Sequence, residues 1–260
     1  MQMKKTILPL TFALLVLVIW QALTSVFRIP EFLLPSPLRI LDQVKLDYGD
    51  LFNQGFVTLV EALLGLLVAV ATGFLLGAAF ALSGTLERMV LPYAVASQAI
   101  PIIATAPLLI LWLGSGMASK VAMAALICFF PMVVNSTRGL RAASNEQLAL
   151  MRVFGATVWQ TFWKLRLPTS LVYVLSGMRV SAALAMIGAI VAEYAGADRG
   201  LGYVITQATY RLDTPRLFAG ILYSALGGWL LFLAVAFVER VALARYRDDL
   251  GSGASGRRLT

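Results

Sequence analysis

The chain has 260 residues, of which 60% are hydrophobic and only 13% are charged. Soluble domains carry about 25% charged residues, so this composition excludes an ordinary soluble protein and indicates an integral membrane protein. The formal net charge of +8 would suit nucleic acid, but the basic residues lie at the ends of apolar segments, where membrane topology accounts for them. We therefore expect the lipid bilayer as a partner and no nucleic acid.

The chain has no histidine and a single cysteine, Cys128, which lies inside an apolar run. Histidine is the usual zinc ligand and the usual general base near neutral pH. The composition therefore predicts neither a metal site nor a catalytic centre, and one cysteine cannot form an internal disulfide.

A helix needs about 20 mostly apolar residues to cross a bilayer. Six segments meet this requirement, so the sequence predicts a single-domain, all-α membrane protein with six transmembrane helices. The predicted spans are residues 7–27, 57–82, 89–113, 118–136, 173–195 and 217–238. The first could instead be a signal peptide, because Lys4 and Lys5 precede its apolar core, but its length and the lack of an Ala-x-Ala site favour an uncleaved helix. We expect a disordered tail over about 248–260.

The basic residues between the spans predict the orientation. With the N-terminus in the cytoplasm, thirteen lysines and arginines fall on the inner side and seven on the outer side, while Arg179 lies within the fifth span. Cytoplasmic segments carry an excess of Lys and Arg, so we expect both termini in the cytoplasm. The outer links over 28–54 and 196–216 are either partner surfaces or ordinary connectors, and the first contains a candidate amphipathic helix over 38–52.

Small residues at every fourth position mark helix faces that can approach closely in lipid. The fifth and sixth spans carry short ridges of this kind, and the second span carries the ridge Gly65, Ala69, Gly73, Gly77 and Ala81. The sequence leaves open whether these faces pack within one subunit or between two. Pro101 and Pro107 interrupt the third span and are expected to kink it.

Polar residues within the spans are candidates for lining a pathway, although plain packing is the alternative for each. They are Ser97, Gln98, Pro101, Thr105, Asn135 and Glu193. Glu61 and Glu193 are costly at membrane depth, which suggests a function. Both lie near the predicted outer ends of their spans, so the sequence favours solvated, interfacial carboxylates.

The basic loop over residues 137–172 contains the start signals of two short helices. In a capping box, a Ser or Thr side chain and a Gln or Glu side chain three residues later each bond the other residue's backbone N–H. This spacing occurs at Ser144 and Gln147, and again at Thr157 and Gln160. We therefore expect two short helices in this loop, on the cytoplasmic side.

Gly155 suits the left-handed turn that ends the first of these helices, and Pro168 is expected to close the segment. The first helix carries the apolar residues Leu148, Leu150, Met151 and Phe154. Concentrated apolar surface normally marks an interaction site, so the loop is predicted to dock a partner. The alternative is a loop packed against its own helix ends.

This loop resembles the cytoplasmic loop of binding-protein-dependent ABC importer permeases, whose pattern is Glu-Ala-Ala-x3-Gly-x9-Ile-x-Leu-Pro. Gly155 and Pro168 stand in its register, and Leu165 replaces its isoleucine. Ala149 stands where the pattern has glutamate, so any ionic contact of that glutamate is missing. The resemblance implies docking on an ATPase through Leu148, Ala149, Leu150, Met151, Arg152, Phe154, Gly155, Ala156, Leu165, Leu167 and Pro168.

Further stretches resemble the branch of this family that serves nitrate, sulfonates, taurine, riboflavin and thiamine precursors. They are Leu34-Pro-Ser-Pro37, Ser97-Gln-Ala-Ile-Pro101, Ala106-Pro-Leu-Leu-Ile-Leu-Trp112, Gly116-Met-Ala-Ser-Lys120, Phe129-Phe-Pro131, Ala192-Glu-Tyr-Ala-Gly-Ala197 and Gly200-Leu-Gly-Tyr203. The second and fourth of these are most similar to permeases for hydroxymethylpyrimidine, a thiamine precursor.

The resemblance implies a pore made by two copies of this chain in the bacterial inner membrane, with two ATP-binding subunits beneath it and a solute-binding protein outside. It points to hydroxymethylpyrimidine as the solute, with sulfonates, taurine, nitrate or riboflavin as alternatives. This chain lacks the phosphate-binding pattern Gly-x4-Gly-Lys-Ser/Thr. It is therefore expected to be no enzyme and to bind no cofactor, with ATP and Mg²⁺ held by the partner.

Two other classes of protein compete with this interpretation. An intramembrane protease would need His-Glu-x-x-His, paired membrane aspartates or a histidine beside serine, and the predicted spans offer none of these. An autonomous channel or secondary transporter stays open, but few charges in the spans give proton or sodium coupling little support.

Overall fold

The computed structural model describes the backbone of residues 2–255 and the side chains of residues 7–244. Within that part of the chain every regular element is a helix. The long helices are α1 (Gln2–Val26), α3 (Tyr48–Leu82), α6 (Met117–Leu140), α9 (Leu167–Gly196) and α11 (Thr214–Ser255). The shorter ones are α2 (Pro37–Leu46), α4 (Gly84–Ser97), α5 (Ile102–Leu113), α7 (Asn145–Val153), α8 (Val158–Thr161), the π-helical η1 (Phe162–Arg166) and α10 (Leu201–Tyr210).

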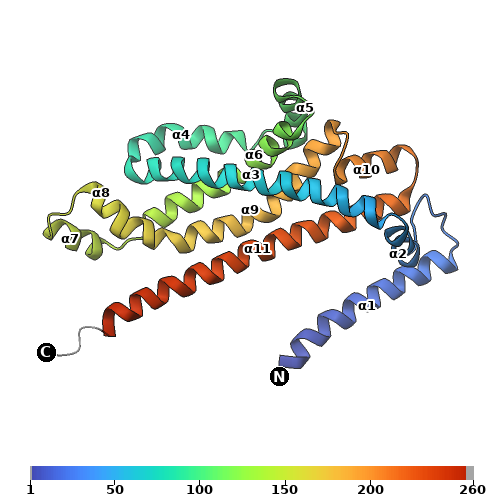
Figure 1. The fold of residues 1–260 in the computed structure, drawn as a ribbon, viewed down its shortest axis with the longest axis horizontal. Helices are drawn as coiled ribbons and strands as arrows, with labels where there is room; N and C mark the ends of the chain where they lie inside the picture. Colours follow the sequence, from blue (N-terminus) through green and yellow to red (C-terminus); the bar gives the residue numbers. More distant parts are fainter. Residues whose placement is uncertain (1, 256–260) are drawn as a thin grey trace.

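Five helices are long and apolar enough to cross a membrane, and the bent pair α4 and α5 would make a sixth span. Figure 1 shows α3, α6, α9 and α11 running along one axis and α1 standing apart from them, with α7 and α8 at one end and α2 and α10 at the other. The predicted all-helical membrane fold is therefore confirmed. α11 stays helical to Ser255, past residue 248, where the disordered tail was expected to begin; the rest of that tail, 256–260, lies outside the described residues.

The predicted span over 89–113 is broken more sharply than the kink expected at its prolines. α4 and α5 meet at an angle of 101°, with a break between Ser97 and Ile102. Pro101, the residue before α5, has the extended-side ψ of 117° and no N–H to continue a helix, so the chain turns there instead of bending gently. Pro107 lies inside α5 without ending it.

The centre of the bundle is formed by close contact between α3, α6 and α9. A Cβ added to Gly73 of α3 would lie 2.6 Å from the Cβ of Met132 on α6. A Cβ added to Gly188 of α9 would lie 2.6 Å from the backbone Cα of Ala124 on α6. Lipid supplies no hydrophobic drive between helices, so this close approach is what holds them together. The small-residue ridges of the second and fifth spans therefore pack within the subunit.

We predict that Gly73→Ala lowers the thermal stability of the detergent-solubilised protein, because the new methyl group has no space against Met132. Overpacking a tight interface costs about 1–3 kcal/mol. Gly84→Ala is the matched control, since a Cβ at Gly84 meets nothing within 4 Å. Equal melting temperatures for the two variants, measured by fluorescence-detected size exclusion after heating, would contradict this account of the interface.

Candidate functional site

The two short helices of the central loop begin as predicted, each with a complete capping box. At α7 the Gln147 N–H donates to Ser144 Oγ (3.2 Å) and the Ser144 N–H donates to Gln147 Oε1 (3.0 Å). At α8 the Gln160 N–H donates to Thr157 Oγ1 (3.2 Å) and the Thr157 N–H to Gln160 Oε1 (2.8 Å). A hydrogen bond with the Ser144 side chain also lowers the pKa of the exposed Glu146 carboxyl, which keeps it charged at the positive end of α7.

Gly155 ends α7 in the predicted left-handed conformation, with φ of +66°. Its N–H donates to the Arg152 carbonyl, and the Ala156 N–H donates to the Met151 carbonyl, both at 3.0 Å. This pair of bonds is the Schellman motif, which satisfies the last carbonyls of the helix. The turn therefore fixes the angle at which α7 and α8 leave one another.

The prediction that Pro168 closes the loop is wrong. Pro168 lies in the first turn of α9, and α8, η1 and α9 follow one another without a gap. A proline fits there because its missing N–H falls where the wider π-helical bonds of Phe162–Arg166 give way to the α-helix. The second half of the loop is thus a continuous extension of the fifth span.

The loop presents a larger apolar surface than the sequence indicated. Phe154 is 75% exposed as expected, whereas Leu148 and Met151 are half-buried. Sequence reasoning missed a further set of exposed apolar side chains, which comprises Val153, Val158, Trp159 and Trp163. Trp159 and Trp163 pack edge to face at 5.5 Å between ring centroids. Their spacing of four residues was the signal that could have placed them on one helix face.

Two arginines fix both ends of this loop to the C-terminus of α3. Arg141 donates through Nη2 to the Phe80 carbonyl (2.6 Å) and pairs with Glu87 on α4 (2.6 Å). Arg166 donates through Nη1 to the Ala81 carbonyl (3.0 Å). The last carbonyls of a helix lack partners within it, so these bonds satisfy groups that would otherwise be orphaned. The loop is therefore attached to a membrane-spanning helix at both of its bases.

The break between α4 and α5 forms a cavity of about 130 Å³ against α6. Three of the predicted pathway residues, Ser97, Gln98 and Thr105, line it together with the aromatic rings of Phe129 and Phe130. The cavity thus combines two hydroxyls and an amide with aromatic surface. Its lining includes no charged side chain.

Two other predicted pathway residues, Asn135 and Pro101, are not part of the lining of this cavity. Asn135 packs against Gly177 of α9, and its Nδ2 donates to the Pro131 carbonyl (2.8 Å). Pro101 is exposed at the α4–α5 break itself. Asn135 is therefore a helix-packing residue of the α6–α9 interface, and its amide is already engaged.

Glu193 is only 1% exposed, so its expected position as a solvated interfacial carboxylate is wrong. Its carboxyl accepts the Thr58 hydroxyl (2.7 Å) and the Gly202 N–H (2.6 Å). The neighbouring Leu201 N–H donates to Thr58 Oγ1 (2.8 Å) and the Gly200 N–H to Gln54 Oε1 (2.7 Å). Side chains of α3 and α9 therefore occupy the free N–H groups at the start of α10. The burial of Glu193 could not be predicted from local sequence, because it depends on α10 folding back onto the spans.

Glu61 is also buried, at 2% exposure, and the same expectation is wrong for it. Its Oε2 makes no hydrogen bond to the described residues, and the charges of Glu193 and Lys120 lie near enough to act on its carboxyl. Lys120, at the outer end of the predicted span over 118–136, is itself buried and donates to the Ser115 carbonyl. The buried charges of α3, α6 and α9 therefore gather in one place, where opposite charges reduce the cost of burial.

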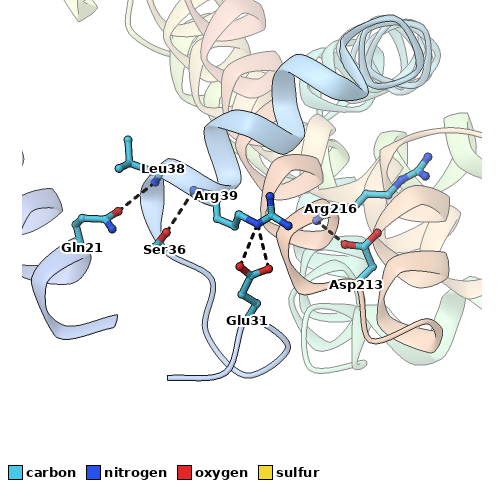
Figure 2. Close-up of polar contacts among 7 residues, drawn as sticks. All are labelled: Gln21, Glu31, Ser36, Leu38, Arg39, Asp213 and Arg216. Carbon is cyan, nitrogen blue, oxygen red and sulfur yellow. Dashed lines mark hydrogen bonds and ion pairs between the residues drawn. The ribbon is translucent and has the colours of Figure 1, made fainter. Parts of the chain in front are cut away.

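A set of polar contacts holds the segment between α1 and α3 in place (Figure 2). Arg39 pairs with Glu31 at 3.0 Å, and Gln21 Oε1 accepts the Leu38 N–H at 3.2 Å. Ser36 caps α2 by accepting the Arg39 N–H at 3.3 Å. These contacts lie at the end of the bundle opposite the α7 loop.

The predicted single amphipathic helix over 38–52 is divided in two. α2 ends at Leu46, α3 begins at Tyr48, and Asp47 between them has a non-helical φ of −103°. The Asp47 carboxylate at this turn faces Arg216 of α11 at 3.5 Å.

Comparison with known proteins places this geometry in a family. Residues 65–242 match the family described as the binding-protein-dependent transport system inner membrane component. The chain belongs to this family. It is therefore a permease subunit of an ABC importer for small solutes and a multi-pass protein of the inner membrane. The predicted family and general function are confirmed.

Several relatives are similar over almost their whole length. The chain is 37% identical to the formylaminopyrimidine transport permease ThiX of Halalkalibacterium halodurans, over 90% of this chain and 94% of that one. It is 37% identical to the riboflavin permease RibX of Chloroflexus aurantiacus, over 90% and 88%. It is 31% identical to the putative aliphatic sulfonates permease SsuC of Bacillus subtilis, over 95% and 88%.

A solved structure supports the fold. The MetNI methionine ABC transporter, in an inward-facing conformation, matches with a TM-score of 0.66 over 75% of this chain and 97% of that chain. The two sequences are 16% identical, so the likeness concerns the fold alone.

We predict that Glu193→Ala destabilises the protein while Glu193→Gln is much milder. Alanine leaves the buried Gly202 N–H without an acceptor, which costs about 1–3 kcal/mol. Thr58 keeps its second bond, to the Gln54 carbonyl (3.1 Å), so the loss concentrates on Gly202. Glutamine retains one acceptor oxygen for that N–H. Thermal unfolding in detergent micelles distinguishes the two, and equal destabilisation would show that the charge matters rather than the acceptor.

Proposed function

We propose that this permease forms, with a second identical copy, the pore of an importer whose two ATP-binding subunits dock on residues 141–166, here called the docking loop. The observation that carries the proposal is the exposed apolar surface of α7 and α8, in a chain that belongs to an importer family. An exposed apolar surface of this extent outside a membrane normally marks a site that a partner protein covers. ATP and Mg²⁺ would be bound by the ATP-binding subunits, not by this chain.

The attachment of the docking loop supports a mechanical role. Because Arg141 and Arg166 bind the carbonyls of Phe80 and Ala81, a displacement of the loop acts directly on α3. ATP binding can bias the pore only if the partner contacts differ between its two states. We propose that Phe154 and Met151 supply most of the binding free energy for the ATP-binding subunit. The turn at Gly155 would set the orientation in which α7 docks.

The orientation is part of the same proposal: the docking loop and both termini face the cytoplasm. The excess of basic residues on that side supports it. In Figure 1 the start of α1 and the end of α11 are both directed toward the end that carries α7. The opposite end, with α2 and α10, would then face the solute-binding protein.

We further propose that the imported solute is a pyrimidine precursor of thiamine, hydroxymethylpyrimidine. The 37% identity to a formylaminopyrimidine permease supports this class. The cavity at the α4–α5 break also suits it, since an amide, two hydroxyls and aromatic rings can bind a neutral planar ring. A sulfonate would bring a charge to a lining without a cation. A second copy of the chain would supply the facing wall of this cavity.

Gly155→Pro is expected to leave membrane insertion intact and abolish association with the ATP-binding subunits. Proline holds φ near −65°, whereas the turn needs +66°. Gly114→Pro is the control, because Gly114 has a φ of +80° and open space around it but lies outside the docking loop. Co-purification of the ATP-binding subunits with each tagged variant gives the answer. Normal recovery with Gly155→Pro would refute the role of the turn.

Deleting the gene should abolish uptake of labelled hydroxymethylpyrimidine, and an excess of an aliphatic sulfonate should not compete in the wild type. Complementation with the intact gene controls for effects on neighbouring genes. Unchanged uptake after deletion would leave the importer architecture standing. The imported solute would then be a sulfonate, taurine, nitrate or riboflavin, and the same uptake assay tests each of them.

A further inference from the structure

The cavity at the α4–α5 break has the size of a single aromatic ring. Its volume is about 130 Å³. An engineered apolar cavity of about 150 Å³ takes up benzene, so this one suits one six-membered ring. The cavity lies where the chain turns by 101° between α4 and α5 (Figure 1). Three polar side chains, those of Ser97, Gln98 and Thr105, line it among apolar ones. Hydrogen bonds from this lining to a ligand therefore depend on these three side chains.

The two hydroxyl groups have already used their protons. Ser97 Oγ donates to the Ala94 carbonyl at 2.8 Å, and Thr105 Oγ1 donates to the Ile102 carbonyl at 2.7 Å. A hydroxyl group has one proton, so Ser97 and Thr105 offer a ligand only their lone pairs. Neither side chain donates to a ligand unless it first loses a bond within its own helix.

Gln98 differs from the two hydroxyl residues because its amide is free. Its backbone N–H donates to the Val95 carbonyl at 3.0 Å, which fixes the main chain at the end of α4. Its side chain is exposed and forms no hydrogen bond to any residue that the structure describes. An amide has two N–H donors and an acceptor oxygen in one plane. A single side chain of the cavity therefore offers a donor beside an acceptor.

This pattern is complementary to the edge of an aminopyrimidine. Such a ring has an amino group, which donates, beside a ring nitrogen, which accepts. In protein–DNA complexes the amide of asparagine or glutamine binds the same pair of groups on adenine through two hydrogen bonds. The rings of Phe129 and Phe130 belong to the same lining and offer apolar surface to a flat ring.

We propose that Gln98 is the residue with which this permease recognises its solute, by binding the edge of an aminopyrimidine. The amide oxygen accepts from the amino group, and the amide N–H donates to the adjacent ring nitrogen. The inference rests on the proposed function, because it takes hydroxymethylpyrimidine as the solute, and it adds the atoms that select this solute. A sulfonate group has acceptor oxygens only, so it would leave the amide oxygen of Gln98 without a partner, which costs affinity.

The test compares uptake of labelled hydroxymethylpyrimidine with uptake of a labelled analogue that lacks the amino group. Both are measured in the deletion strain carrying each permease variant, at concentrations that saturate the binding protein. Gln98→Met keeps the length of the side chain and removes the amide. It should lower the preference for the amino compound about tenfold, because the hydrogen bond to the amino group is lost.

Two features of this design isolate the permease. Every strain has the same binding protein, so the preference of that protein cancels when variants are compared. A ratio measured within one strain also does not depend on how much permease the strain makes. Gln207→Met on α10 is the matched control, because Gln207 lies outside this cavity. It should keep the wild-type ratio.

Gln98→Glu is the second variant. Its carboxyl keeps an oxygen that accepts from the amino group whether or not it is protonated, so this variant should retain most of the preference. An unchanged ratio in Gln98→Met would overturn the role of Gln98, and so would an equal loss of preference in both variants. If deletion of the gene leaves uptake of hydroxymethylpyrimidine unchanged, the proposed solute fails and this role fails with it. That result needs no variant, so the two failures are distinguishable.

Discussion

The close approach of α3, α6 and α9 is the constraint on which the rest of this permease depends. In lipid, apolar side chains gain nothing by leaving the solvent, so helices are held by the contacts they make at short range. Gly73 of α3 and Gly188 of α9 approach α6 so closely that an added methyl group has no space there. These contacts combine three spans into one body, and the polar sites at both ends are built on it.

Polar groups are then placed where helices end. The start of α10 is satisfied by Gln54, Thr58 and Glu193, and the end of α3 by Arg141 and Arg166. A buried backbone group without a partner costs free energy, so these bonds stabilise the chain reversals that follow each helix end. Glu193, Arg141 and Arg166 therefore have a structural role, which is to bind the free backbone groups at helix ends.

The sequence predicted what local rules decide and failed where distant segments meet. The capping boxes at Ser144 and Thr157 and the turn at Gly155 depend on neighbours three or four residues away, and all three are present. The burial of Glu193 depends on α10 folding back onto α3, which no local pattern encodes. The break at Pro101 was expected as a kink, but the structure turns the chain by 101° there, with α4 beside α3 and α5 beside α6 and α9. The exposure of Trp159 was not predicted, because this residue stands at a variable position of the family pattern.

α3 joins the two ends of the bundle. Gln54 lies near its start, where it accepts the Gly200 N–H, and Ala81 near its end accepts a hydrogen bond from the docking loop. At 1.5 Å per residue these positions are about 40 Å apart along one uninterrupted helix. The contacts that hold the start of α10 and those that hold the docking loop are therefore built on the same element, whereas the chain of α4 and α5 is broken at Pro101.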